Sequence, residues 1–135
     1  MKRNNKTPAP SPFLLIRKKR VLIVDDESPT VELLQAWLEP EYVVFKAYDG
    51  EEGLQKAIEG KPDLIFLDVN MPRMNGFETL KRLKADSRTR HIPVIMLTAE
   101  AHTSSIVDAQ EAMATDYAIK PIDMESLLPY VKRYI

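Results

Sequence analysis

Five short apolar runs, rich in β-branched residues, alternate with longer segments whose apolar residues recur at helical spacing. The runs cover residues 21–24, 42–47, 64–67, 94–97 and 117–119. Each run is continuous rather than alternating, which is typical of parallel strands buried on both faces. Because parallel strands are joined by helical crossovers, the pattern predicts an α/β fold, a (βα)5 chain with a doubly wound, flavodoxin-like parallel sheet of five strands.

The five segments between and after these runs are predicted to be amphipathic helices. Their apolar positions are Val31, Leu34 and Leu38; Leu54, Ala57 and Ile58; Phe77, Leu80 and Leu83; Ile106, Ala109 and Met113; and Leu128, Val131 and Ile135. Ser28 is predicted to be an N-cap with Pro29 at the first helical position. Asp123 is predicted to cap the last helix. Pro129 falls within that helix and predicts a kink or a late helix start.

Composition narrows the class of protein. The 135 residues are enough for one domain, and 44% hydrophobic with 29% charged residues is typical of a globular chain. Cysteine is absent, which excludes a disulfide scaffold, a thiolate metal site and a cysteine nucleophile. No apolar stretch is long enough for a membrane span, and the longest N-terminal run, residues 13–16, is too short for a signal peptide. We therefore expect a cytoplasmic protein with no membrane insertion.

The net charge of −1 is the sum of a basic N-terminal segment and an acidic remainder. Residues 1–20 carry seven basic side chains and no acidic ones, whereas the other 115 residues carry 12 basic and 20 acidic ones. Residues 1–16 also contain three prolines and show no periodicity, which predicts a flexible basic tail ahead of a domain at 17–135. Such a tail is either simply solvated or an arm for nucleic acid or an acidic membrane surface. We expect no direct nucleic-acid binding.

The carboxyl ends of parallel strands share one edge of a sheet, where ligands bind. Five polar side chains follow or end the predicted strands: Asp25, Asp26, Asp68, Thr98 and Lys120. Each alone could be an ordinary cap, turn or surface residue. Together, however, the carboxylates would repel one another and raise one another's pKa unless a cation were present. Mg²⁺ suits such oxygen ligands, and with it Asp68 could accept a phosphoryl group while Thr98 and Lys120 contact the phosphoryl oxygens.

Four segments carry a resemblance to a known family. They are VLIVDDE at 21–27, PDLIFLDVNMPRMNGFE at 62–78, PVIMLTA at 93–99 and DYAIKP at 116–121. In this order and at these intervals, the sequence resembles the receiver domain of bacterial two-component response regulators, from about residue 19 to 135. Within that family it is similar to the single-domain, chemotaxis-type regulators.

The resemblance implies a role for each residue at the sheet edge. Asp68 would be the phosphoacceptor, and Mg²⁺ would be held by Asp25, Asp26, Asp68 and the main-chain carbonyl of Asn70. Thr98 resembles the switch hydroxyl of the family, Lys120 the lysine that contacts phosphate, and Tyr117 the aromatic residue that changes rotamer on activation. The resemblance also implies a cis Lys120-Pro121 bond.

The same resemblance implies the partners. The phosphodonor would be a sensor histidine kinase or a histidine phosphotransfer protein. The output would be a downstream protein target, or a homodimer, through the face formed by the fourth helix, the fifth strand and the fifth helix. The chain would not be an enzyme beyond its own phosphorylation and dephosphorylation chemistry. It would be either a stand-alone regulator or a receiver excised from a longer protein.

Some positions depart from the family pattern or tune it. Met113 and Thr115 stand where the family usually has Gly-Ala-Asp or similar, so the fourth helix should end differently or at a small cost in stability. Asn70 and Glu100 would border the acyl phosphate and are expected to tune its hydrolysis. His91 and His102 are expected at the surface, and Trp37 and Phe66 in the core.

Three other functions could be carried by a chain of this fold class. A nucleotide- or flavin-binding module is disfavoured because the loop after the first strand, Asp-Asp-Glu-Ser, contains neither G-x-G-x-x-G nor a P-loop. An aspartyl phosphatase or mutase would need a second aspartate two residues after Asp68, where this chain has Asn70. The alternative that stays open is a receiver-like protein-interaction module that is not phosphorylated.

Overall fold

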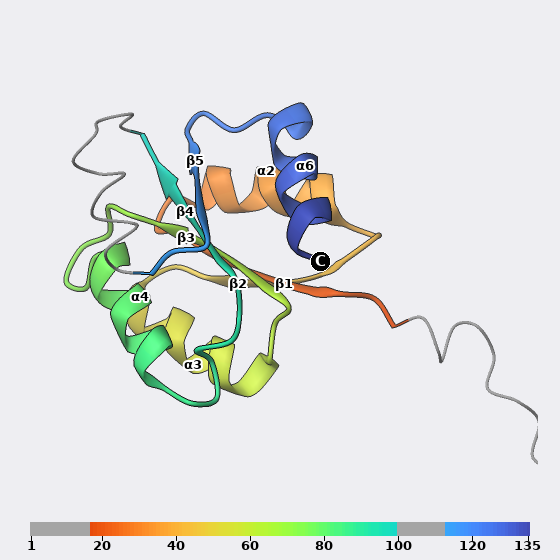
Figure 1. Cartoon of the computed structure of the whole chain (residues 1–135). Helices are drawn as coiled ribbons and strands as arrows, with labels where there is room; N and C mark the ends of the chain where they lie inside the picture. Colours follow the sequence, from red (N-terminus) through yellow and green to blue (C-terminus); the bar gives the residue numbers. More distant parts are fainter. Residues whose placement is uncertain (1–16, 100–112) are drawn as a thin grey trace, which may run out of the picture.

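A single parallel sheet forms the centre of the computed structural model, which describes residues 17–99 and 113–135 (Figure 1). Its strands are β1 (Arg20–Val24), β2 (Val43–Ala47), β3 (Leu64–Asp68), β4 (Val94–Thr98) and β5 (Asp116–Ile119). Their order is β2-β1-β3-β4-β5, and every neighbouring pair is parallel. The predicted doubly wound, flavodoxin-like sheet is confirmed.

Helices cover both faces of this sheet, as Figure 1 shows. They are α2 (Ser28–Leu38), α3 (Gly50–Gly60), α4 (Gly76–Ala85) and α6 (Met124–Tyr134). Successive strand residues point to opposite faces. Leu22 and Val24 therefore pack with the residues of α3 and α4, whereas Val21 and Ile23 pack with those of α2 and α6. Both faces of the strands are covered by mainly apolar side chains, which is why the strands are continuous hydrophobic runs in the sequence.

Some predicted features fall outside the described residues. These are the tail at 1–16, the helical positions Ile106 and Ala109, and the side chains of Glu100 and His102. Within the described part, Phe66 is completely buried, and Trp37 is partly buried against the same apolar cluster, so both are core residues as predicted. His91 is exposed, also as predicted. None of the described helices is long and apolar enough to cross a membrane.

The start of α2 differs from the prediction by one residue. Glu27, not Ser28, is the N-cap, and its side chain makes no capping hydrogen bond. The carbonyl of Glu27 accepts from the N–H groups of Thr30 and Val31 at 3.1 and 3.2 Å, so Ser28 already lies within the helix. Pro29 occupies the first turn, where its missing N–H costs nothing.

The last helix also corrects a prediction. It begins at Met124 and runs through Pro129, so the predicted late start is wrong. Asp123 is the cap as predicted, because its Oδ1 accepts from the N–H of Ser126 at 2.8 Å and thereby satisfies a first-turn donor. Leu127 is buried rather than the predicted Leu128, which is half-buried.

Met113 has an unusual backbone conformation at the position where the sequence departs from the family pattern, while the helix expected before it lies outside the described residues. Its φ of 70° lies in the left-handed region, which glycine adopts far more readily than a residue with a side chain. The side chain is 69% exposed. Met113 therefore gains little from packing to offset this backbone conformation.

Candidate functional site: an acidic pocket at the carboxyl edge of the sheet

The carboxyl ends of four strands converge at one edge of the sheet. Asp25 directly follows β1, and its N–H donates to the carbonyl of Ala47 at the end of β2 at 3.0 Å. Asp68 ends β3 and Thr98 ends β4. The N–H of Lys120, just past β5, donates to the carbonyl of Thr98 at 2.7 Å. The sheet ladder therefore brings together residues that are far apart in the sequence.

Three carboxylates gather at this edge. One oxygen from each of Asp25, Asp26 and Asp68 can be chosen so that all lie within 4.8 Å of one another. Asp25 is fully buried and Asp68 is 4% exposed, whereas Asp26 is open to solvent. The acidic pocket thus combines two buried carboxylates with one that is exposed to solvent.

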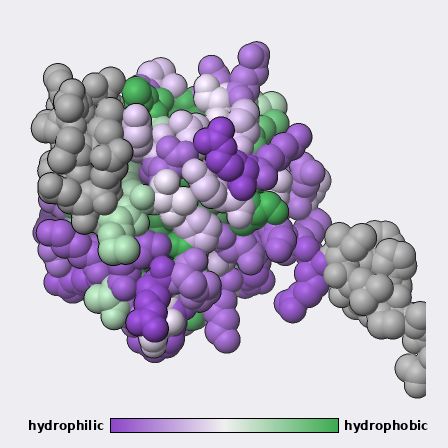
Figure 2. Space-filling model, viewed as in Figure 1, coloured by the Kyte–Doolittle hydropathy of each residue, from purple (hydrophilic) through white to green (hydrophobic). Residues whose placement is uncertain are grey.

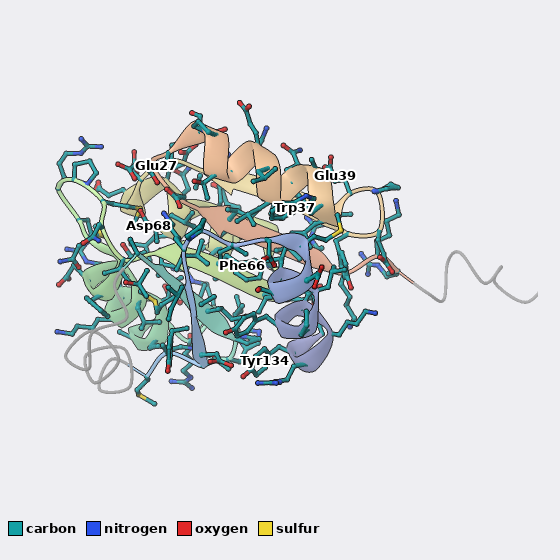
Figure 3. All side chains as sticks on the ribbon, turned by 90° about the horizontal axis from the view of Figure 1, so that it is seen from above. Glu27, Trp37, Glu39, Phe66, Asp68 and Tyr134 are labelled. Atoms are coloured by element: carbon teal, nitrogen blue, oxygen red, sulfur yellow. The ribbon has the colours of Figure 1, made fainter. Side chains whose placement is uncertain are left out.

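Lys120 is the counter-charge in this pocket. Its Nζ lies 2.8 Å from Asp25 Oδ2, 3.2 Å from Asp68 Oδ1 and 3.3 Å from Glu27 Oε1. Glu27 lies at the same end of the sheet as Asp68 (Figure 3). Sequence reasoning gave Glu27 no role, although its place directly after the aspartate pair was a usable signal. The Lys120-Pro121 bond is cis, as the resemblance implied.

The crowding of charge shifts the pKa values of two groups. Burial raises the pKa of Asp68 to about 7, and the charge of Asp25 adds to the rise, while Lys120 and a backbone hydrogen bond from Asn70 oppose it. Burial alone would lower the pKa of Lys120, but its ion pairs with the carboxylates of Asp25 and Asp68 raise that pKa above its usual value. Lys120 therefore stays protonated at neutral pH, whereas ionisation of Asp68 lowers the stability of the folded state.

The pocket fits a hard divalent cation. Asp25 Oδ2 is buried and, within the described part of the chain, has no hydrogen bond of acceptable geometry, although Lys120 Nζ is close. The other two members of the cluster, Asp26 and Asp68, are also carboxylates, and Asn70 lies in the loop two residues after Asp68. A cluster of carboxylate oxygens is the ligand set that Mg²⁺ prefers.

Thr98 and Tyr117 lie on the two neighbouring strands β4 and β5. Thr98 is 4% exposed and pairs with Ile119 in the β4–β5 register, while Tyr117 pairs with Met96 two rows below. Tyr117 is half-buried and packs against the apolar cluster on the α3 and α4 side. Thr98 therefore lies at the carboxyl end of the sheet, directly after the Asp68–Leu97 pair of the β3–β4 register, and Tyr117 lies on the adjoining strand.

The loop after Asp68 is held tightly against the sheet. The N–H of Gly76 donates to the carbonyl of Val69 at 2.8 Å, and Asn75 caps α4 by accepting from the N–H of Glu78 at 2.9 Å. A side chain at Gly76 would collide with the carbonyl of Asp68 and would lie 2.8 Å from Val69 Cα. The backbone carrying Asp68 is thereby packed directly against the start of α4.

Comparisons with known proteins agree with this geometry. The family model described as the response regulator receiver domain matches residues 21–132. The chain is 43% identical to response regulator PleD of Caulobacter vibrioides over 114 residues, covering 84% of this chain and 25% of PleD. It is 39% identical to protein PilH of Pseudomonas aeruginosa, covering 81% of this chain and 91% of PilH. The chain thus spans a quarter of PleD but most of PilH.

A solved structure gives the same result for the fold. The chemotaxis response regulator CheY4 of Vibrio cholerae superposes with a TM-score of 0.83 at 34% identity, covering 88% of this chain and 100% of CheY4.

Proposed function

Since the chain belongs to the response regulator receiver domain family, we propose that it is a phosphorylation-dependent response regulator with Asp68 as its phosphoacceptor. The observation that carries this proposal is the arrangement of Asp68 with its neighbours. Its Oδ1 lies 3.2 Å from Lys120 Nζ, and one oxygen from each of Asp25, Asp26 and Asp68 lies within 4.8 Å of the other two, close enough to share one metal ion. We also propose that the chain is divided into a basic tail at residues 1–16 and a receiver domain at residues 17–135.

The proposed reaction is a phosphoryl transfer. A carboxylate oxygen of Asp68 attacks the phosphorus of a phosphohistidine on a sensor kinase or phosphotransfer protein. The new P–O bond forms as the P–N bond breaks, and the imidazole nitrogen keeps the bonding electron pair and takes up a proton. Lys120 pairs with a phosphoryl oxygen, and the hydroxyl of Thr98 donates to another. Mg²⁺, when bound by Asp25, Asp26, Asp68 and the carbonyl of Asn70, neutralises the negative charge that the phosphoryl oxygens bring.

The proposed output is a change in one surface. Phosphorylation adds negative charge at Asp68, Thr98 moves toward it, and Tyr117 packs inward. These movements would bias the face that includes β5 and α6, which binds a downstream protein or a second copy of the chain. We expect the protein to act in the cytoplasm and to have no activity beyond its own phosphorylation and dephosphorylation.

The test is the intact mass after incubation with acetyl phosphate and Mg²⁺. We expect one added phosphoryl group, which is lost with EDTA and in Asp68→Asn. Asp86→Asn is the matched control, because Asp86 lies at the end of α4 and pairs with Arg88 at 2.8 Å, outside the pocket. An adduct that persists in Asp68→Asn would refute the assignment. If no adduct forms and a beryllofluoride mimic fails to bind, the receiver-like interaction module is the better description.

A further inference from the structure

The ammonium group of Lys120 is shared among three carboxylates that differ in burial. Asp25 and Asp68, at 2.8 and 3.2 Å, have buried side chains, whereas the side chain of Glu27, at 3.3 Å, is 63% exposed. Glu27 and Lys120 also line one open hollow of about 320 Å³ beside the acidic pocket. Glu27 therefore contacts the ammonium from the solvent side, while the two aspartates contact it from inside the pocket.

The backbone of Glu27 is fixed by the same pocket. Its N–H donates to Asp25 Oδ1 at 2.9 Å, and its carbonyl accepts from the N–H groups at the start of α2. Asp25 thus binds the backbone of Glu27 through one carboxylate oxygen and lies close to Lys120 with the other. The contact between Lys120 Nζ and Glu27 Oε1 completes a closed ring of three residues.

The side chain of Glu27 does nothing for the helix that it begins. Serine, threonine, aspartate and asparagine are the preferred N-caps, because their short side chains reach the first free N–H groups. Glu27 is the N-cap of α2, yet its side chain makes no capping hydrogen bond. Its carboxylate instead extends to a residue 93 positions further along the chain. The contact with Lys120, and not helix capping, therefore accounts for a glutamate at this position.

Most ion pairs on a protein surface contribute little. Figure 2 shows hydrophilic side chains over most of the face that it presents, and exposed pairs of such side chains are each worth about 1 kcal/mol or less. The Glu27 pair differs in one respect, because the side chain of Lys120 is only 14% exposed. The backbone of Lys120 is also fixed, since its N–H donates to the carbonyl of Thr98 at 2.7 Å. The ammonium therefore has few alternative positions.

Glu27 matters most when the aspartates are engaged elsewhere. A divalent cation held by Asp25 and Asp68 would take their charge away from Lys120 and would repel its ammonium group. Of the three carboxylates that contact Lys120 in the described part of the chain, Glu27 would then be the one still available to it. The Glu27–Lys120 attraction is thus stronger with the cation bound than without it, and an interaction that is stronger in one state favours that state.

We propose that Glu27 is a positioning residue, which retains Lys120 at the solvent side of the acidic pocket and so tightens the binding of Mg²⁺. The same carboxylate competes with a phosphoryl group for the ammonium, so it weakens the contact between Lys120 and the phosphoryl oxygens. This inference rests on the proposed function, because it concerns the regulation of the same pocket.

The first test measures Mg²⁺ affinity by urea unfolding of the full chain. The free energy of unfolding is followed against MgCl₂ concentration at constant ionic strength, which gives the dissociation constant of the folded protein. Glu27→Gln should weaken Mg²⁺ binding about two- to fivefold, the range of a partly exposed ion pair. The matched control is Glu32→Gln, which removes another exposed carboxylate of α2 that does not line the hollow, and it should bind Mg²⁺ like the unaltered chain.

A second variant separates the contact with Lys120 from the mere presence of a negative charge. Glu27→Asp keeps the charge, but its side chain is one methylene group shorter and withdraws the carboxylate from Lys120. It should reproduce most of the loss of Mg²⁺ affinity seen in Glu27→Gln. Unaltered affinity in Glu27→Asp would show that Glu27 acts only as a general surface charge and would overturn the proposal.

Beryllofluoride, at saturating Mg²⁺, measures the competition for Lys120. Both Glu27 variants should bind it about two- to fivefold more tightly, because Lys120 is then fully available to the anion. A variant that only damaged the pocket would bind both Mg²⁺ and beryllofluoride more weakly, and that result would also overturn the proposal. If the unaltered chain binds neither, the proposed function fails. If it binds both and the Glu27 variants bind identically, only this inference fails.

Discussion

Replacing Asp68 by asparagine is expected to stabilise the metal-free protein, although we propose that Asp68 carries its function. Burial, followed by the charge of Asp25, raises the pKa of Asp68 from 3.8 to about 7. One pKa unit corresponds to about 1.4 kcal/mol, so ionising Asp68 in the folded state costs up to about 4 kcal/mol. This pKa already includes the opposing attraction of Lys120, so asparagine avoids the cost of ionisation and keeps a neutral contact with Lys120. Residual access of solvent to the pocket reduces the gain below that upper bound. We expect a net gain of about 1–3 kcal/mol at pH 8.

The pH dependence of this gain has a definite sign. The folded-state pKa of Asp68 lies above the unfolded-state value, so the folded state binds the proton more tightly. The stability from this group is complete below about pH 4, falls as the pH rises, and is lost above about pH 7. The advantage of Asp68→Asn should therefore grow between pH 4.5 and 8.

Urea unfolding in EDTA across this pH range measures the effect. Asp86→Asn is the control, because the hydrogen bonds from Arg88 lower the pKa of Asp86 to about 2, and its contribution is constant above pH 4. Mg²⁺ at pH 8 should stabilise the unaltered protein more than Asp68→Asn, since the cation binds the folded carboxylates. Parallel pH profiles for the unaltered protein and Asp68→Asn, or a less stable variant at pH 8, would refute the reasoning.

Three further substitutions test the packing by urea unfolding. Gly76→Ala should lower the free energy of unfolding by about 1–3 kcal/mol, because the new Cβ would collide with the backbone of Asp68. Gly60→Ala is the comparison, since the atoms nearest to its Cβ belong to the Phe45 ring, a side chain that can shift. Equal losses of stability in the two variants would contradict this reasoning. Thr89→Val should cost about 1–2 kcal/mol by removing the 2.7 Å hydrogen bond to the carbonyl of Leu83, and Thr89→Ser should retain most of it. Met113→Gly should stabilise by about 1 kcal/mol by relieving the φ of 70°, and no gain would show that the side chain compensates.

The fold could be predicted from the sequence because both faces of the sheet are buried. Phe66 packs with the α2 and α6 layer, while Ile65 and Leu67 pack with the α3 and α4 layer. The sequence of β3 is therefore apolar at successive positions, which is typical of a central strand and not of a strand with one face in solvent. The pocket could be predicted for a related reason. Parallel strands end at one edge, so a polar residue that ends a strand is placed there whatever its distance along the chain.

The details that were missed depend on contacts between distant segments. Glu27 accepts a hydrogen bond from Lys120, which lies 93 residues further along the chain, and no local sequence pattern predicts such a contact. The start of α2 was misplaced because serine is a good N-cap by propensity, but Asp25 Oδ1 already holds the N–H of Glu27 at 2.9 Å and sets the turn one residue earlier. Leu127 and Leu128 are equally apolar, so only their packing against the sheet distinguishes them.

The division of charge in this chain follows from the direction of its strands. In a parallel sheet, residues just before the strands lie at one edge and residues just after them lie at the other. Arg17–Arg20 stand at the start of β1 and Asp25–Glu27 just after it, so one strand alone separates a basic edge from an acidic one. The net charge of −1 therefore describes neither surface. A cation bound at the acidic pocket would therefore change the charge of that edge alone, because the apolar sheet separates it from the basic residues at the start of β1.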